Sequence, residues 1–253
     1  MLETCRVLNR DQIKMLAIIT MTFNHIAHVL LVPGSLLFEV FEDIGYFTAI
    51  TMCFFLLEGY HYTRSRKAYA KRLLIFALIS EIPFLLAMGY FQMNVIFTLF
   101  ICFLIFCVMD SGLAGWQRNL IVLGLVLSTV ICDWALLLAI AAVLFKKNEN
   151  HPRGLAFAYG IMFAIFWLMN IPGYAPADAV YPLLSGSAIL HGFFAALGIA
   201  ASGVATLVLY NGRKSEKYVK FNKWFFYIYY PAHLLLLWLI RTFVWHQLIF
   251  VAA

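Results

Sequence analysis

Charged residues are scarce in this chain. Asp, Glu, Lys and Arg make up 12% of its 253 residues, whereas hydrophobic residues make up 64%. An average soluble domain is about one quarter charged and about half apolar. No polar stretch is long enough to build a soluble core of its own. We therefore predict one polytopic membrane domain over residues 1–253, folded as an all-α helical bundle in which lipid covers most of the apolar surface.

Short motifs that would indicate other classes of protein are also missing. The five cysteines include no Cys-x-x-Cys pair, and four lie in apolar runs, which disfavours a disulfide framework or a zinc site. The absence of a P-loop and of Gly-x-Gly-x-x-Gly disfavours an ATPase or a dinucleotide-dependent oxidoreductase. His25 and His28 lack the intervening Glu of a zinc peptidase, so we expect no metal. Residues 1–11 lack the layout of a signal peptide, and the first apolar run is expected to remain as a span.

Apolar runs that suit a membrane span recur along the chain. We predict about nine spans, within a range of about eight to ten because some runs are short. The runs cover residues 13–32, 44–60, 72–88, 95–109, 120–132, 135–145, 155–169, 183–210 and 224–244. The run 183–210 fits either one tilted span or a re-entrant piece and a span, with the break near His191 and Gly192. The acidic segment 35–43 is expected to be a connection.

The basic residues indicate the orientation. If the amino terminus is cytoplasmic, every one of the 18 lysines and arginines except Arg241 falls in a cytoplasmic segment: 6–14, 64–72, 118, 146–153 or 213–223. This distribution follows the positive-inside rule. We therefore predict a multi-pass protein of the bacterial cytoplasmic (inner) membrane. The net charge of +6 is then a topology signal, and no nucleic-acid partner is expected.

Several ionisable side chains lie within the predicted spans, where a charge costs at least about 2.5 kcal/mol. A helix rises about 1.5 Å per residue, which places His25, Glu81 and His233 about 18, 14 and 17 Å from the cytoplasmic ends of their spans. Glu58 and His61 are one turn apart near the cytoplasmic surface, whereas Asp133 and His191 belong to the outer half. A carboxylate and two histidines at one depth predict a polar cavity capable of proton transfer.

Each of these groups also has a purely structural interpretation. His25 can be a neutral histidine bonded to a carbonyl, and Glu81 can serve only the backbone freed by the kink at Pro83. Glu58 can pair with Arg64 or Arg66. The tyrosines 227, 229 and 230 can be interfacial packing. The convergence of polar groups below a basic cytoplasmic mouth favours function, because arginines bind phosphate in a bidentate way and a buried base can deprotonate an amine or hydroxyl.

Four patches of the sequence resemble the TraX-type family of membrane acyltransferases, named for the conjugative-pilin acetylase. They are IKMLAIITMTFNHIAH (13–28), EGYHYTRSRKAYAKRLLIFALISEIPF (58–84), NVIFTL (94–99) and KWFFYIYYPAHLLLL (223–237). A more distant likeness connects the chain with transmembrane acyltransferases that carry a functional histidine in the first span. That role maps to His25. The family usually has Asp-His there, and this chain has Asn24-His25.

The resemblance implies an enzyme that transfers an acyl group, in the first instance acetyl, from acyl-CoA to an amine or hydroxyl. The acceptor would be a membrane-inserted peptide such as a pilin amino terminus. On this view the catalytic set is His25, His233, Glu58, Glu81 and Asn24, with Glu58 or Glu81 replacing the absent aspartate. The donor-binding set is Arg64, Arg66, Arg72, His61 and Tyr230.

Two other functions fit the same residues. A proton-coupled transporter or exporter also uses intramembrane His and Glu, although it usually has repeated halves, which this sequence does not show. A non-catalytic assembly factor for a surface structure would need none of these side chains for chemistry.

Overall fold

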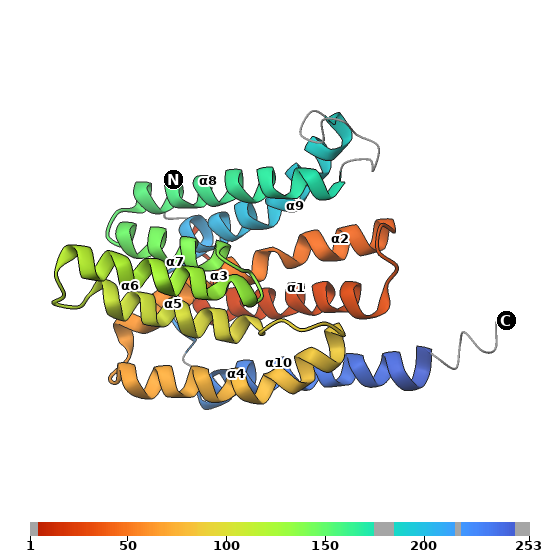
Figure 1. Cartoon of the computed structure of the whole chain (residues 1–253), viewed down its shortest axis with the longest axis horizontal. Helices are drawn as coiled ribbons and strands as arrows, with labels where there is room; N and C mark the ends of the chain where they lie inside the picture. The colour runs from red at the N-terminus through yellow and green to blue at the C-terminus, as the bar shows by residue number, and fades with distance from the viewer. Residues whose placement is uncertain (1–4, 175–184, 216–218, 246–253) are drawn as a thin grey trace.

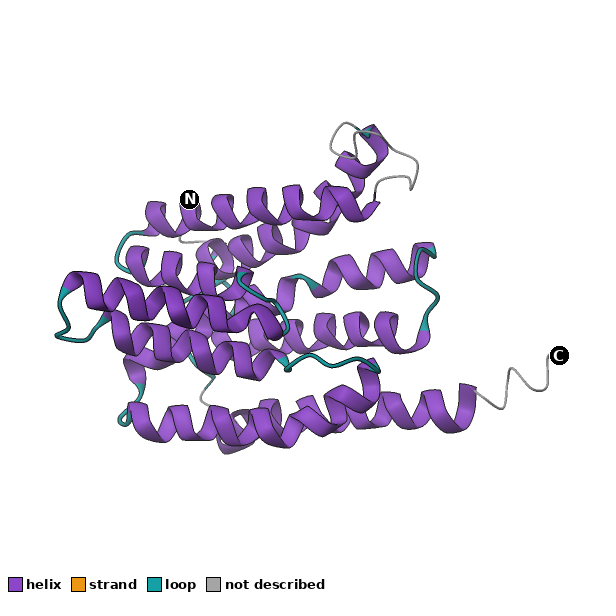
Figure 2. Ribbon diagram, viewed as in Figure 1, coloured by secondary structure: helices purple, strands orange, loops and turns teal. Residues whose placement is uncertain are grey.

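The computed structural model describes residues 5–174, 185–215 and 219–245, and within these ranges the chain forms helices and connections without a β-strand (Figure 2). The α-helices are α1 (Arg10–Leu30), α2 (Leu36–Gly45), α3 (Phe47–Tyr62), α4 (Arg66–Met88), α5 (Val95–Met109), α6 (Gly115–Ser128), α7 (Leu137–Asn148), α8 (Pro152–Asn170), α9 (Gly186–Val204) and α10 (Val219–Leu239). Short 3-10 segments follow α6 and α8 (Thr129–Ile131 and Ile171–Tyr174), and π-helical segments follow α9 and α10 (Ala205–Leu209 and Ile240–Trp245). The predicted all-α class is confirmed.

Four segments of the described chain are long and apolar enough to cross a membrane: Arg10–Leu30, Leu36–Tyr62, Pro152–Tyr174 and Gly186–Leu209. Large apolar side chains are exposed along the outside of the bundle, and α6 contains no buried residue at all. Such a surface needs lipid as its solvent. The chain is therefore a helical membrane protein, and the count of about nine spans stays a prediction.

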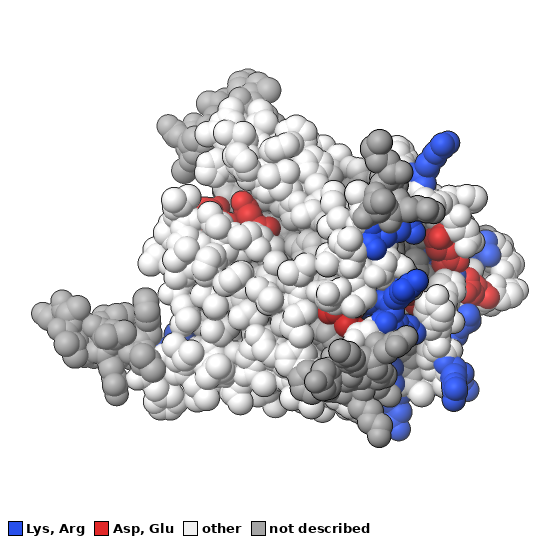
Figure 3. All heavy atoms as spheres, turned by 180° about the vertical axis from the view of Figure 1, so that it is seen from behind, with Lys and Arg blue, Asp and Glu red and all other residues white. Residues whose placement is uncertain are grey.

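The helices run roughly along the long axis of the molecule, with the α3–α4, α5–α6 and α7–α8 connections at one end and the α1–α2 connection at the other (Figure 1). Helices α4 and α10 pack along one side, and α8 and α9 along the opposite side. Most of the visible lysines and arginines gather at one end, while the body of the surface is almost free of charge (Figure 3). This is the arrangement that the positive-inside rule predicts. Lys217, one of the predicted cytoplasmic residues, lies outside the described residues.

Local signals explain where the main helices begin and end. Asn9 and Gln12 form a reciprocal capping box at the start of α1. The Ser65 hydroxyl accepts from the amide of Ala68 at the start of α4, and Gly89 ends that helix in the left-handed conformation, with φ of 78°. These caps fix the two helices that carry half of the predicted site residues.

The acidic segment 35–43 is helical, so the prediction of a connection there is wrong. Ser35 caps α2, and α2 runs into α3 with only a kink at Tyr46. A Cβ on Gly45 would lie 2.2 Å from Cβ of Asn24, so only glycine allows α1 and α2 to approach this closely. Of the two alternatives for residues 183–210, the one with a break near His191 and Gly192 is not observed, because α9 continues through both residues.

The most deeply buried side chains come from the middle of the chain. Helices α3, α5, α7 and α8 contribute a fully buried group that consists of Ile50, Phe103, Phe106, Leu138, Phe145 and Met162. Hydroxyl bonds join further helices to this core, for example Thr51 of α3 to Ser202 of α9 at 2.7 Å. The core holds one wall of α3 rigid, and the opposite wall of α3 borders a cavity.

Candidate active site

A cavity of about 780 Å³ extends from the basic end of the molecule into the bundle. Helices α1, α3, α4, α5 and α10 line it, together with the turn before α7. Its mouth is basic and is formed by Arg10, Lys14, Arg64, Arg72 and Lys214. Its floor is formed by Asn24, His25, Asp133, Trp134 and Tyr230. Lys14 and His25 are separated by about 17 Å of helix α1, so the cavity spans about half of a bilayer core.

Two histidines from opposite ends of the chain form the central contact at the floor. Nδ1 of His25 lies 2.6 Å from Nε2 of His233, and the two rings are nearly parallel, at an interplanar angle of 19°. Both side chains are buried, with 5% and 6% exposed. Nδ1 of His233 lies 2.8 Å from the carbonyl oxygen of Tyr229. The hydrogen bonds from His25 through His233 thus end at a backbone carbonyl oxygen.

This arrangement decides the tautomer of each ring. A carbonyl oxygen can only accept, so Nδ1 of His233 carries a hydrogen, and in the neutral ring Nε2 is then an acceptor. Nδ1 of His25 must therefore donate to it. Nε2 of His25 is left with a free lone pair. His25 is in the form that a general base requires.

Tyr229 keeps His233 in place. Its ring stacks on the His233 ring at 4.9 Å, and its hydroxyl lies 2.8 Å from the Thr22 hydroxyl of α1. Thr22 donates to the carbonyl of Ile18, so it accepts from Tyr229. This contact connects α10 to α1 beside the histidine pair and sets the distance between the two helices.

Asn24 precedes His25 in α1, but its side chain contacts α2. Its Nδ2 donates to the carbonyl of Glu42 at 3.2 Å, and its side chain packs on Gly45. Asn24 therefore connects α1 to α2 and lines the floor. It makes no hydrogen bond to His25 among the described contacts.

The two predicted carboxylates lie away from the histidine pair. Glu81 accepts from the amide and the side chain of Asn94, at 3.1 and 2.6 Å, so it supports the start of α5. Glu58 accepts from the Tyr210 hydroxyl and lies 3.9 Å from the guanidinium of Arg10. Neither lines the cavity.

Asp133 is the carboxylate that the fold does bring to the floor. It stands in the turn between α6 and α7, where Trp134 and Leu136 both have positive φ, of 57° and 58°. Bulky residues rarely adopt that conformation, and such strain gathers at functional sites. The Trp134 ring is fixed by stacking on Phe166 at 5.6 Å. The turn thus presents Asp133 and an aromatic ring to the same cavity that His25 lines.

At the mouth, the structure separates the predicted donor-binding residues into two groups. Arg64 and Arg72 line the cavity. Nε of Arg72 donates to the Tyr227 hydroxyl at 3.2 Å, which aims the guanidinium along the wall. Arg66 and His61 are outside the lining, and they form ion pairs with Asp110 and Glu149.

Comparison with known proteins identifies the family of this chain. The model of the family described as "TraX protein" matches residues 9–241. The chain belongs to the TraX family. It is also 28% identical over 243 residues to a protein of Dichelobacter nodosus named "Probable fimbrial assembly protein FimC, serogroup H1", an alignment that covers 89% of this chain and 93% of the relative. No solved structure matches. The predicted family is confirmed.

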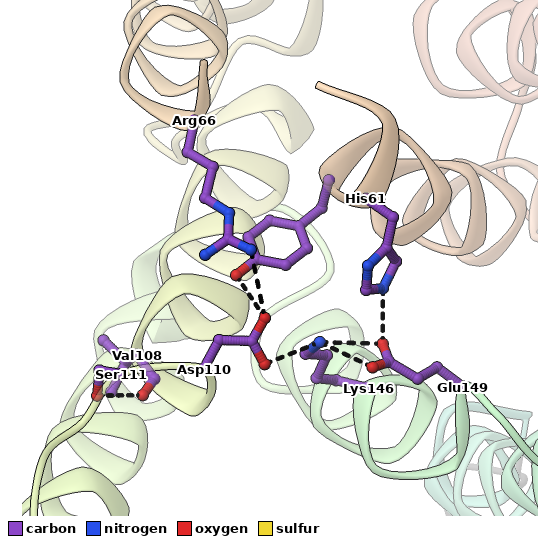
Figure 4. A network of polar contacts seen from close by, with 8 residues as sticks. His61, Arg66, Val108, Asp110, Ser111, Lys146 and Glu149 are labelled. Carbon is purple, nitrogen blue, oxygen red and sulfur yellow. Dashed lines mark hydrogen bonds and ion pairs between the residues drawn. The ribbon is translucent and has the colours of Figure 1, made fainter. Parts of the chain in front are cut away.

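In this TraX-family chain, Arg66 and His61 form part of an ion-pair network beside the mouth (Figure 4). Asp110 lies between Arg66, at 3.6 Å, and Lys146, at 2.9 Å. Glu149 lies between Lys146 and His61, at 2.9 Å from each. The network joins the ends of α3, α4, α5 and α7 that lie beside the basic mouth, and so it stabilises the frame around the cavity.

Asp110 is ionised by this network. Burial alone raises the pKa of its carboxyl, but hydrogen bonds from Tyr60 and Lys146 and the charges of Lys146 and Arg66 outweigh that effect and hold the pKa below its usual value. Lys146 is only 5% exposed, so the carboxylate also satisfies a nearly buried cation.

Sequence reasoning missed three basic residues of the mouth. Arg10 and Lys14 are one turn apart at the start of α1, and Lys214 follows α9. The ammonium groups of Lys14 and Lys214 lie over the rings of Phe226 and Tyr62, at 4.8 and 4.4 Å. The one-turn spacing of Arg10 and Lys14 was a signal that both would face the same side.

Proposed function

We propose that this chain is an acyltransferase of the cytoplasmic membrane, with its amino terminus in the cytoplasm. It would move an acyl group, in the first instance acetyl, from acyl-CoA to an amine or hydroxyl of a membrane-associated or exported acceptor. The observation that carries this proposal is the continuity of one cavity from a basic mouth to the free Nε2 of a neutral histidine pair.

The donor fits the polarity of the cavity. The phosphates of acyl-CoA need cations, and Lys14, Arg64, Arg72 and Lys214 provide them at the mouth. The pantetheine arm is flexible and uncharged. The walls between mouth and floor are largely apolar and include Ile18, Met21, Ala49, Met52, Leu56 and Leu73. The thioester would then lie at the floor, next to His25.

His25 acts as the general base. Its Nε2 takes the proton of the acceptor nitrogen or oxygen as that atom attacks the thioester carbonyl carbon. The proton returns to the departing thiolate, which leaves as CoA-SH. His233 holds the ring of His25 through the hydrogen bond at Nδ1. When His25 becomes protonated, His233 shares the positive charge, and its own Nδ1 hydrogen points to the carbonyl oxygen of Tyr229. It takes the orienting part that an aspartate has in Asp-His pairs.

Asp133 would bind the acceptor. A carboxylate at the floor stabilises an ammonium group and orders an amine before its deprotonation, and the face of Trp134 beside it suits a cation as well. Glu58 and Glu81 do not enter the mechanism, because both are engaged elsewhere.

The family and the relative support a role in a surface fibre. The family resemblance implies acetylation of a pilin, and the relative from Dichelobacter nodosus is named for fimbrial assembly. A pilin or similar peptide presents an amino terminus at the membrane, which makes it a suitable acceptor for a buried site of this kind.

The test uses purified protein in detergent, labelled acetyl-CoA and a synthetic peptide with an apolar segment and a free amino terminus. His25→Ala is expected to lower turnover at least about 100-fold. His151→Ala is the matched control, because that histidine is exposed at the start of α8. Unchanged turnover in His25→Ala would refute the proposal.

A further inference from the structure

Tyr230 adds a further polar group to the lining of the cavity. The side chain is only 4% exposed, and its hydroxyl has no hydrogen-bond partner in the described part of the chain. Buried hydroxyls are almost always bonded, because an unpaired one forfeits its interaction with water. A group kept in this state inside a cavity indicates a ligand atom as its partner.

The position of the ring is tightly fixed. It meets His25 edge-on, with the centroids 5.9 Å apart, and His233 in the same way at 5.7 Å. Tyr230 also lines the cavity together with Val95, the first residue of α5. The backbone amide of Val95 lies near the Tyr230 oxygen.

The neighbouring helix start strengthens this interpretation. The Asn94 side chain caps the amide of Ile96, and the amide of Phe97 bonds to the Asn94 carbonyl. The positive end of α5 therefore points at the floor. Developing negative charge is stabilised there, beside the base that starts the reaction.

We propose that the Tyr230 hydroxyl donates a hydrogen bond to the carbonyl oxygen of the acyl donor and stabilises the oxyanion formed during transfer. The inference rests on the proposed acyl transfer and adds a catalytic residue to it. The sequence predicted only that Tyr230 helps to bind the acyl donor, whereas here Tyr230 contacts the reacting carbonyl oxygen.

The acceptor nitrogen forms a bond to the carbonyl carbon, and the π pair of the carbonyl moves to its oxygen, which accepts from Tyr230. Nε2 of His25 receives the proton that the nitrogen loses. The oxyanion then re-forms the carbonyl, the carbon–sulfur bond breaks, and the thiolate takes the proton from His25. Tyr230 keeps its own proton throughout.

Tyr230→Phe separates this role from packing. The phenyl ring retains the edge-on contacts with both histidines, and the lost hydroxyl has no hydrogen-bond partner among the residues that the structure describes. The thermal midpoint should therefore stay the same or rise. The expected loss in kcat is about 100- to 1,000-fold, the effect of removing one oxyanion donor, and KM for acetyl-CoA should change only slightly.

Tyr159→Phe is the matched control. Tyr159 is equally buried, but its hydroxyl bonds to Thr206 at 2.9 Å, away from the cavity lining. That variant should lose thermal stability and keep its kcat. Wild-type kcat in Tyr230→Phe would overturn the inference and leave the proposed function standing, as would a loss of kcat accompanied by a fall in thermal midpoint. No transfer by the wild-type protein would overturn both.

Discussion

Nδ1 of His25 lies 2.6 Å from Nε2 of His233, although 208 residues separate the two in the chain. The carbonyl of Tyr229 fixes the direction of hydrogen bonding through both rings. Among the described residues, no carboxylate bonds to either ring. A chain with Asn24 in place of an aspartate before His25 therefore still presents an imidazole of fixed orientation.

His233→Phe tests that arrangement. The substituted ring can still stack on Tyr229, but it offers no acceptor to Nδ1 of His25. We expect kcat to fall about 100-fold with little change in KM for acetyl-CoA, because orientation and charge stabilisation of the base are lost. Steady-state kinetics over a range of pH measures this. Tyr229→Phe is the control, because it removes only the bond to Thr22 and keeps the carbonyl. Equal kcat in the two variants would contradict the role of His233 in orienting His25 and stabilising its charge.

The histidine pair also shows what depth along a helix can and cannot predict. The rise per residue placed His25, Glu81 and His233 at one level. It does not give the direction in which a side chain points. His25 and His233 face each other, whereas Glu81 turns to Asn94 at the start of α5. The all-α class followed from composition alone, because lipid admits few other structures.

The turn that carries Asp133 could not be predicted in the same way. A short reversal at Asp133 and Trp134 was the simplest interpretation of two short apolar runs, and it placed Asp133 in the outer half. The observed turn has two bulky residues with positive φ, and it returns Asp133 to the cavity. No local propensity encodes that geometry, because tertiary packing imposes it.

Asp133→Asn should act on the acceptor and spare the donor. Loss of a buried charge-assisted contact of about 1.5–3 kcal/mol corresponds to about a 10- to 100-fold rise in KM for an amine acceptor. KM for acetyl-CoA should not change. Kinetics with each substrate varied in turn provides the measurement. A rise in KM for acetyl-CoA alone would assign Asp133 to the donor instead.

The basic mouth of the cavity is expected to bind the phosphates of acetyl-CoA. Lys14→Ala and Arg72→Ala should each raise KM for acetyl-CoA about 10-fold, because each removes a cation from the cavity wall. Acetyl-pantetheine lacks the nucleotide phosphates, so its KM should be unaffected. Arg66→Ala is the control, since Arg66 contacts Asp110 and not the cavity. Equal effects on both donors would show that the phosphates are not bound at this mouth.

Gly45→Ala tests the approach of α1 and α2. The new Cβ would lie 2.2 Å from Cβ of Asn24, so the helices must separate. We expect the free energy of unfolding to fall by about 1–3 kcal/mol. Adding Asn24→Gly should restore part of it by removing the clashing atom. Gly124→Ala is the control, because nothing lies within 4 Å of that position in α6. Thermal midpoints in detergent distinguish these variants, and a stable Gly45→Ala would disprove the close packing.

Asp110→Asn tests the ion-pair network beside the basic mouth. The folded protein holds the pKa of this carboxyl below its usual value, because the bonds from Tyr60 and Lys146 and the nearby cations outweigh the effect of burial. Its contribution to stability is therefore complete above the unfolded pKa of about 3.9 and is lost as the pH falls through the folded value. At neutral pH the variant should melt at a lower temperature than wild type. The difference should shrink in acid below about pH 4, where wild type loses the same charge. Melting curves at both pH values decide the matter: a difference that stays constant into acid would mean that the charge of Asp110 does not stabilise this end of the bundle.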